Sequence, residues 1–349
     1  MCHLSLFPSI SVLKEPYVLT KADVVERYLP SLLTASSEPV TCFAPSNIAL
    51  CKYWGKREKE LNLPVNSSLS ISLGHLGTQT TLSLAEVDQV WLNGERLTDD
   101  TPFARKVIAF IDLFRRDQAV TLKVDTRNNI PTAAGLASSA SGFAALSLAI
   151  NQFFALDLSD DVLSAFARMG SGSASRSLFQ GFVEWEMGQQ EDGMDSFARP
   201  LVARWDTLRI GLVKVATGEK KVDSRSGMTR TLETASLYQA WPAQAARDIS
   251  RLHSAISDKD FQLLGETAEH NALSMHATMI ASWPPLVYWQ PDSLAAMQKV
   301  WQLREQGIPI YFTMDAGPNL KLLFEAEYEA DVLTAFGEIE VVSPFSAVP

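Results

Sequence analysis

A mostly apolar helix, predicted over residues 141–154, places the strictest demand on how this chain folds. A helix that is apolar on nearly every side cannot face water, so other elements must cover it from several directions. It follows a short predicted strand at residues 120–124 and a connecting stretch rich in small residues at 128–142. The chain therefore needs both a sheet and further helices around this segment.

The rest of the pattern mixes short strands with long helices, which favours an α+β fold over a doubly wound sheet. Asn93-Gly94 is a hairpin signal. Further strands are predicted over residues 67–73, 78–84, 87–92, 181–186, 208–215, 308–314 and 320–324. Further helices are predicted over 21–33, 101–116, 160–170, 232–241, 243–256, 259–282 and 292–306, and whether the helix over 259–282 breaks near His270 is left open.

The length of 349 residues suggests about two domains. Residues 1–40 form an extra segment to which we assign no chemistry. The first domain is predicted at 41–218 and the second at 219–349, with the boundary at Thr217-Gly218.

Charge and cysteine content restrict the partners and the compartment. The 40 acidic and 30 basic residues leave a net charge of −10, which repels nucleic-acid backbones and anionic membranes but is compatible with a local basic pocket. Cys2, Cys42 and Cys51 form no CxxC pair, which favours a reducing compartment. No apolar run reaches the ~18 residues of a membrane span, and no basic region precedes the apolar N-terminal stretch. We predict a cytoplasmic protein that binds neither nucleic acid nor membranes.

The small-residue stretch at 128–142 is the strongest candidate site. Small residues let backbone amides approach an anion, and a helix N-terminus adds unpaired N–H donors. Ser138, Ser139 and Ser141 add hydroxyl donors for phosphate. The alternative is a Ser/Ala-rich helix start that packs tightly and caps itself, and composition alone leaves both open.

Four further turns carry polar groups, and each also has a purely structural interpretation. They are Gly170–Ser177 with Arg176, Tyr53–Arg57 with Lys56, Thr313–Asn319 with Asp315, and Ser224–Met228 with Arg225. An arginine fork suits carboxylate or phosphate, and a carboxylate at a strand end suits a base. His270 and His276, six apart, are poorly spaced for one metal, and we interpret them as structural. Together the turns indicate phosphate-bearing small molecules as ligands.

Taken together, these segments resemble the diphosphomevalonate decarboxylase family of the GHMP kinase superfamily. The resemblance implies a first domain similar to domain 2 of ribosomal protein S5, a GHMP kinase α/β-sandwich second domain, and a site between them. Residues 1–40 depart from the usual start of the family. The matching strings run in family order from about residue 42 to the C-terminus: Ala44–Ala49, Lys52–Arg57, Leu63–Ser70, Asn128–Ser141, Gly170–Arg176, Gly181–Trp185, Ser224–Met228, Met275–Thr278 and Met314–Asn319.

The family converts mevalonate diphosphate and ATP into isopentenyl diphosphate, ADP, phosphate and CO₂, in the mevalonate pathway of isoprenoid biosynthesis. The resemblance implies that Asp315 orients or deprotonates the tertiary hydroxyl, that Asn47 helps to hold it, and that Lys52 is a further catalytic residue that neutralises charge near the ATP. It implies substrate contacts from Tyr53, Lys56, Ser171, Ser173, Arg176, Arg225, Met228 and Ala316, and ATP contacts from Gly135, Leu136, Ala137, Ser138, Ser139 and Ser141. Mg²⁺ would arrive with ATP, with Ser138 or Ser139 as the candidate contact, and a homodimer is expected.

Two alternatives remain. A related kinase or decarboxylase could act on mevalonate or its monophosphate, but Lys56 and Arg225 suit a terminal phosphate and favour the diphosphate. A non-catalytic RNA- or protein-binding module is the alternative from another class, because S5-like domains occur in such proteins. The charge of −10 and the presence of Asp315 argue against that module.

Overall fold

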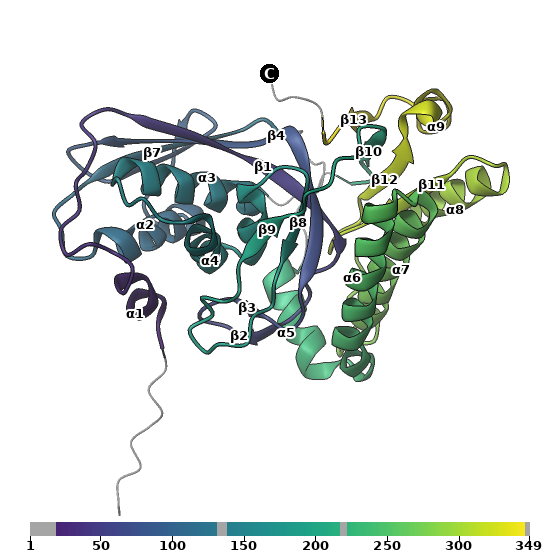
Figure 1. Ribbon diagram of the computed structural model, residues 1–349, viewed down its shortest axis with the longest axis horizontal. Coiled ribbons are helices and arrows are strands. Elements are labelled where there is room, and N and C mark those ends of the chain that lie inside the picture. The colour runs from purple at the N-terminus through teal and green to yellow at the C-terminus, as the bar shows by residue number, and fades with distance from the viewer. Residues whose placement is uncertain (1–18, 131–137, 217–221, 346–349) are drawn as a thin grey trace, which may run out of the picture.

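The computed structural model describes residues 19–130, 138–216 and 222–345. Two groups of elements lie side by side, each built around its own sheet (Figure 1). The N-terminal group, coloured purple to teal, occupies the left of the view, and the C-terminal group, green to yellow, the right. This is the mixed α+β arrangement that the sequence predicts.

Within the described residues, the first sheet has seven strands in the order β6-β5-β7-β4-β8-β9, with β1 also paired to β4. All pairs are antiparallel except β5 with β7. Its strands are β1 (Val40–Cys51), β4 (Ser68–Leu84), β5 (Gln89–Leu92), β6 (Glu95–Arg96), β7 (Leu122–Asn128), β8 (Phe182–Trp185) and β9 (Ala198–Pro200), and a separate hairpin joins β2 (Lys56–Glu58) to β3 (Leu63–Pro64).

Strand β4 corrects one sequence prediction. Residues 67–73 and 78–84 were predicted as two strands, but they form one strand. The pairing of β1 along it nevertheless jumps from Pro45 opposite Gly77 to Asn47 opposite Ser72. The register shift therefore falls where the sequence predicts a break, and it places Asn47 of β1 opposite Ser72, in the first half of β4.

The apolar helix is α3 (Ser138–Phe153), and the expectation that it is buried is confirmed. It packs on β1 and β4 and also contacts α4 (Asp160–Gly170) and the short 3₁₀ helix η1 (Gly172–Leu178). Among its residues Ala144, Ala145, Ala149 and Ile150 are fully buried. Helices α1 (Lys21–Glu26) and α2 (Pro102–Arg115) complete this half, and α1 is shorter than the helix predicted over 21–33.

The second sheet is antiparallel, in the order β11-β12-β10-β13. Its two faces belong to different cores, because Tyr311 lies in the core shared with α6 and α7 whereas its neighbours Ile310 and Phe312 face the core under α8 and α9. The elements are β10 (Leu208–Val213), β11 (Ile310–Thr313), β12 (Leu320–Glu325), β13 (Glu340–Val342), α5 (Ser224–Thr234), η2 (Ser236–Ala240), α6 (Trp241–Asp258), α7 (Phe261–Ile280), α8 (Pro291–Glu305), η3 (Ala326–Tyr328) and α9 (Glu329–Phe336).

Two predictions in this half need correction. The single helix predicted over 232–241 is wrong. Helix α5 begins earlier, at Ser224, and three elements share the predicted range: the end of α5, η2 and the start of α6. Helix α7 runs through His270 without a break. The proposed boundary at Thr217-Gly218 lies outside the described residues. The chain passes from the first sheet to the second between β9 and β10, because β10 pairs with β12 and β13. The domain division itself stays a prediction.

A hydrophobic core joins the two halves. Ile48 and Ile71 of the first sheet belong to the same buried cluster as Leu252 of α6 and Ile210 of β10. Helices α6 and α7 both pack on β1. No helix in the described part of the chain is long and apolar enough to cross a membrane.

Candidate active site

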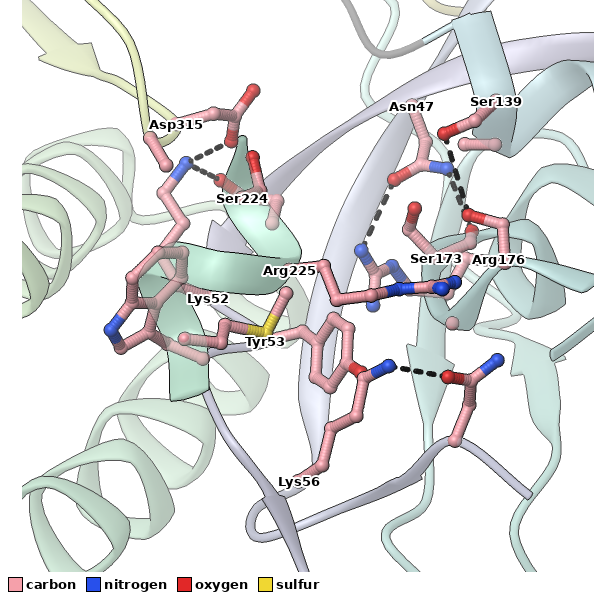
Figure 2. Close-up of a pocket in the computed structure, with 18 of the residues that line it drawn as sticks. Asn47, Lys52, Tyr53, Lys56, Ser139, Ser173, Arg176, Ser224, Arg225 and Asp315 are labelled. Carbon is pink, nitrogen blue, oxygen red and sulfur yellow. Dashed lines mark hydrogen bonds and ion pairs between the residues drawn. The ribbon is translucent and has the colours of Figure 1, made fainter. Parts of the chain in front are cut away.

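A cavity of about 340 Å³ opens between the two halves of the molecule. Figure 2 shows Asp315 and Lys52 on one side and Asn47, Arg176 and Ser139 on the other. The predicted site residues that line this cavity are Asn47, Lys52, Tyr53, Lys56, Ser139, Ser171, Ser173, Arg176, Arg225, Met228, Asp315 and Ala316. Turns that are far apart in the sequence therefore meet around one space.

Asp315 follows β11 and is held by two lysines. Lys52 Nζ lies 2.9 Å from Asp315 Oδ1, and Lys321 Nζ lies 3.5 Å from Oδ2. Both lysine side chains are 2% exposed, whereas the aspartate is 35% exposed. His276 Nε2 lies 3.1 Å from the carbonyl oxygen of Asp315. Two buried lysines thus hold the Asp315 carboxylate at the lining of the cavity.

Burial lowers the pKa of Lys52, and the attraction of Asp315 opposes that shift. Its ammonium also donates a 2.7 Å hydrogen bond to the carbonyl of Ala49. Sequence reasoning missed Lys321. The signal for it was a lysine inside an apolar strand, because a charge buried there needs an opposite charge or strong hydrogen bonds.

On the other side of the cavity, Arg176 and Asn47 form a fixed pair. Arg176 Nη2 donates to Asn47 Oδ1 at 3.3 Å, and its Nη1 donates to Ser68 Oγ at 2.5 Å. The amide of Asn47 donates in turn to Ser177 Oγ at 2.7 Å. Burial lowers the pKa of Arg176 to about 10, which leaves it charged at neutral pH. Its Nε is buried without a hydrogen-bond partner.

Tyr53 also lines the cavity. Its ring packs edge-on against Trp185 at 4.7 Å, and its hydroxyl is buried without a hydrogen-bond partner. Burial raises the pKa of this phenol. Gly172 makes room for the ring, because a Cβ there would lie 2.7 Å from it. A glycine is therefore required at this close approach.

Lys56 and Arg225 form a cationic edge to the cavity. Burial lowers the pKa of Lys56 to about 8, and the positive charges of Arg225 and Lys21 add to this shift. Lys56 Nζ donates to Asn62 Oδ1 at 2.5 Å. Lys21 comes from α1, and its amide donates to Glu60 at 3.5 Å. The segment 1–40, to which the sequence assigned no chemistry, therefore brings a charge close to this edge.

The serine-rich start of α3 is only partly in the cavity wall. Ser139 lines it, and its Oγ lies 3.4 Å from Ser171 Oγ. Ser138 is exposed at the helix start, outside the lining. Ser141 is fully buried and hydrogen-bonds to Thr78 Oγ1 at 2.7 Å. The predicted nucleotide contacts Gly135, Leu136 and Ala137 lie outside the described residues.

Several lining residues were not assigned from the sequence. Ser224 and Met275 belong to strings used for the resemblance, but we gave them no role. Lys106 lies in the helix predicted over 101–116, between its apolar positions, and its pattern gave no sign of a role. The cationic side chains of the lining outnumber the carboxylates: Lys52, Lys56, Lys106, Arg176 and Arg225 against Asp223 and Asp315.

Among the described residues, no group of three or more His, Cys, Asp or Glu side chains is placed to hold a metal ion. Magnesium at nucleotide sites usually takes one or two protein ligands and the phosphates of its substrate. The Ser139 hydroxyl and the Asp315 carboxylate both line the cavity. These oxygen donors fit an ion that phosphates carry in.

Solved structures of similar proteins share this architecture. Mevalonate diphosphate decarboxylase from Staphylococcus aureus is 39% identical, with a TM-score of 0.83 over 89% of this chain and 96% of that one. A structure described as MDDEF in complex with MVAPP, AMPPCP and magnesium is 43% identical, with a TM-score of 0.81 over 88% of this chain and 97% of that one. With its two sheets and the cationic cavity between them, this chain is an enzyme of the GHMP kinase fold.

Family models resolve the class further. Residues 44–198 match the diphosphomevalonate decarboxylase-like N-terminal domain, and residues 211–343 match the mevalonate 5-diphosphate decarboxylase C-terminal domain. Diphosphomevalonate decarboxylase of Candida albicans is 39% identical over 83% of this chain and 85% of its own length. The chain belongs to the diphosphomevalonate decarboxylase family.

Proposed function

We propose that this chain decarboxylates mevalonate diphosphate with ATP, giving isopentenyl diphosphate, ADP, phosphate and CO₂. The observation that carries the proposal is Asp315, held between two buried lysines at the wall of a cationic cavity. The MDDEF complex with MVAPP, AMPPCP and magnesium supports it, because that relative is 43% identical.

The chemistry requires a poor leaving group to become a good one. A tertiary hydroxyl leaves poorly, but its phosphate ester leaves well. Departure of that phosphate leaves positive character on carbon, and loss of the substrate carboxylate as CO₂ supplies the electron pair that forms the double bond. The enzyme must therefore align the hydroxyl for phosphoryl transfer and hold the carboxylate.

We assign Asp315 to the hydroxyl, which it orients or deprotonates as a positioned base. Lys52 holds that carboxylate in place through their 2.9 Å contact. Arg176, steadied by Asn47, suits the substrate carboxylate, since its guanidinium presents a planar pair of donors. Tyr53 bounds the substrate between these two groups.

The terminal diphosphate of the substrate suits the cationic edge of the cavity. Lys56 and Arg225 supply charge there, and Ser171, Ser173, Met228 and Ala316 complete the lining. In a partly desolvated cavity these charges act more strongly than on an open surface. The chain's net charge of −10 does not prevent this local attraction.

ATP is assigned to the start of α3, where Ser139 lines the cavity. The first N–H groups of a helix have no partner within the helix and suit phosphate oxygens. We keep Ser138 and the segment 135–137 in this proposed contact. Ser141, whose hydroxyl is buried against Thr78, would support the helix start from within. Magnesium bound to the ATP phosphates would neutralise charge on the transferring group, with Ser138 or Ser139 as the proposed protein contact.

Two further features belong to this proposal. One is a cytoplasmic location, which we propose because the three cysteines, Cys2, Cys42 and Cys51, are too few for a disulfide framework and favour a reducing compartment. A homodimer is expected from the family resemblance, and light scattering of the purified protein tests it.

One assay tests the activity. The protein is incubated with ATP, Mg²⁺ and, separately, mevalonate, its monophosphate and its diphosphate, and ADP and CO₂ are measured. We expect equal amounts of both products with the diphosphate alone. ADP without CO₂ would instead identify a kinase, and neither product would identify a binding module.

A further inference from the structure

Lys52 lies just beyond the end of β1, where its peptide groups leave the ladder of the sheet. Two buried side-chain amides bind these groups instead. Lys52 N–H donates to Asn271 Oδ1 at 2.8 Å, and Lys52 C=O accepts from Asn66 Nδ2 at 2.9 Å. The backbone of Lys52 is therefore held from both sides by groups remote in sequence.

Each of these two amides forms a second hydrogen bond, to a group that serves only as acceptor or only as donor. Asp248 Oδ2 accepts from Asn271 Nδ2 at 2.9 Å, and the Trp241 indole donates to Asn66 Oδ1 at 3.1 Å. Both carboxylate oxygens of Asp248 accept amide hydrogen bonds, and an indole N–H can only donate. Each partner therefore fixes which end of the amide faces Lys52, so neither amide can reverse without losing a buried hydrogen bond.

Burial makes this arrangement costly to break. Asp248 and Asn271 are fully buried, and Asn66 and Trp241 are 3% and 2% exposed. Asp248 also accepts from Gln244 at 2.7 Å, which occupies its other oxygen. Buried hydrogen-bond networks that are fully satisfied fix one geometry.

The arrangement also crosses the molecule. Asn66 and Lys52 belong to the N-terminal half, whereas Trp241, Asp248 and Asn271 lie on α6 and α7. Asp315, which Lys52 meets at 2.9 Å, belongs to the same half as these helices. The hydrogen bonds to the Lys52 peptide therefore tie the lysine to the half of the chain that supplies the aspartate.

We propose that Asn271 and Asn66, oriented by Asp248 and Trp241, are positioning residues that hold Lys52 at the correct distance from Asp315. This inference rests on the proposed function, because it assigns the pair to the reacting hydroxyl. None of the four side chains lines the cavity, so they act through Lys52. Small displacements of an aligned group can cost about a hundredfold in rate.

The test is a double-mutant cycle on turnover. Asn271→Leu removes the acceptor for Lys52 N–H at similar volume, and we expect kcat to fall about ten- to a hundredfold while both KM values change less than about threefold. In a Lys52→Met background, the same substitution should cause less than about a twofold further loss, since the group it positions is gone. An equal further loss would overturn the proposal.

Two more variants keep the test decisive. Thr267→Val is the matched control, because Thr267 is buried one turn earlier on α7 and lies outside the cavity lining; its kcat should stay near the wild-type value. A loss of kcat in Thr267→Val similar to that in Asn271→Leu would count against a positioning role for Asn271.

Asp248→Asn keeps the shape of the side chain but no longer fixes the orientation of the Asn271 amide. It replaces Asn271→Leu in the same double-mutant cycle if Asn271→Leu does not fold. Failure of the proposed function would appear differently, as no CO₂ from the wild-type protein.

Discussion

Among single residues, Asp315 offers the sharpest test of the proposed chemistry. Asp315→Asn keeps the size of the side chain but removes the charge that pairs with Lys52 and Lys321. We expect turnover to fall about 10²–10⁴-fold, the range for loss of a positioned base. Binding of a fluorescent ATP analogue should stay within about threefold of the wild type, because the start of α3 is untouched. Near-normal turnover in this variant would contradict the role assigned to Asp315.

Lys56 predicts a pH dependence. Its pKa, lowered to about 8 mainly by burial, means that the free enzyme loses this ammonium as pH rises through 8. We therefore expect kcat/KM for mevalonate diphosphate to be constant below that pH and to decrease above it. Lys56→Arg should remove this decrease, because an arginine stays charged at pH 8.

A second variant checks the cause of the lowered pKa. Lys21 adds a neighbouring positive charge that disfavours the ammonium of Lys56. Lys21→Gln should therefore move the decrease to higher pH. A decrease that stays in place in both variants would have to come from another group.

What the sequence could predict at this scale depended on local context. Asp315, Lys52 and Arg176 stand in strings that matched a family, and the cavity contains all three. Lys321 lies in strand β12 and Asn271 in helix α7, both among apolar residues. A single polar residue in such a segment does not by itself indicate a function. Their roles depend on partners 6 and 219 residues away, Asp315 and Lys52, and only the folded chain shows those pairings.

At the scale of secondary structure, helix α5 depends on its cap. Asp223 accepts from the amides of Arg225 and Ser226 at 2.9 and 3.1 Å, and its pKa is lowered chiefly by the hydrogen bond from the Ser226 hydroxyl. Asp223→Ala should cost about 1 kcal/mol of stability, the usual value of such a cap. It should also raise KM for mevalonate diphosphate severalfold, because Arg225 stands in the first turn. Denaturant unfolding and initial rates measure the two effects.

Asp223→Asn is the control that separates capping from charge, since asparagine also caps well. It removes a negative charge from the cavity edge, so its KM should equal the wild-type value or fall below it. A raised KM in Asp223→Asn would mean that the carboxylate itself, and not the start of the helix, sets substrate affinity.

The same helix explains where prediction of elements failed. Helix α5 is mostly polar, with Gly227 and Thr231 its buried residues, so apolar periodicity gives no signal before residue 232. By contrast, α4 matches its predicted bounds at Asp160–Gly170, because apolar residues recur along it and two aspartates stand in its first turn. Periodicity locates helices that bury a broad apolar stripe and misses those built to carry polar groups.

For the whole molecule, the chain length of 349 residues predicted about two domains, but not how they join. Strand β10 precedes the predicted boundary yet completes the second sheet. Strand pairing between residues more than a hundred positions apart leaves no local mark in a sequence. The cavity lies between the halves, so its shape depends on this junction.

The shared core predicts that the halves unfold together. Ile48 of the first sheet and Leu252 of α6 lie in one cluster, and a large apolar interface couples domains. Leu122→Ala lies in the core of the N-terminal half and Leu322→Ala in that of the C-terminal half. Each should lower the free energy of unfolding by about 2–5 kcal/mol.

Both substitutions should displace one and the same transition, seen alike by circular dichroism and tryptophan fluorescence. Halves that unfold independently would give two transitions, of which each substitution moves only one. That outcome would mean that the cavity between them is not held by a common core, and the distance between Lys52 and Asp315 would then vary with the motion of one half against the other. Coincident transitions, in contrast, tie the geometry of the site to the stability of the entire chain.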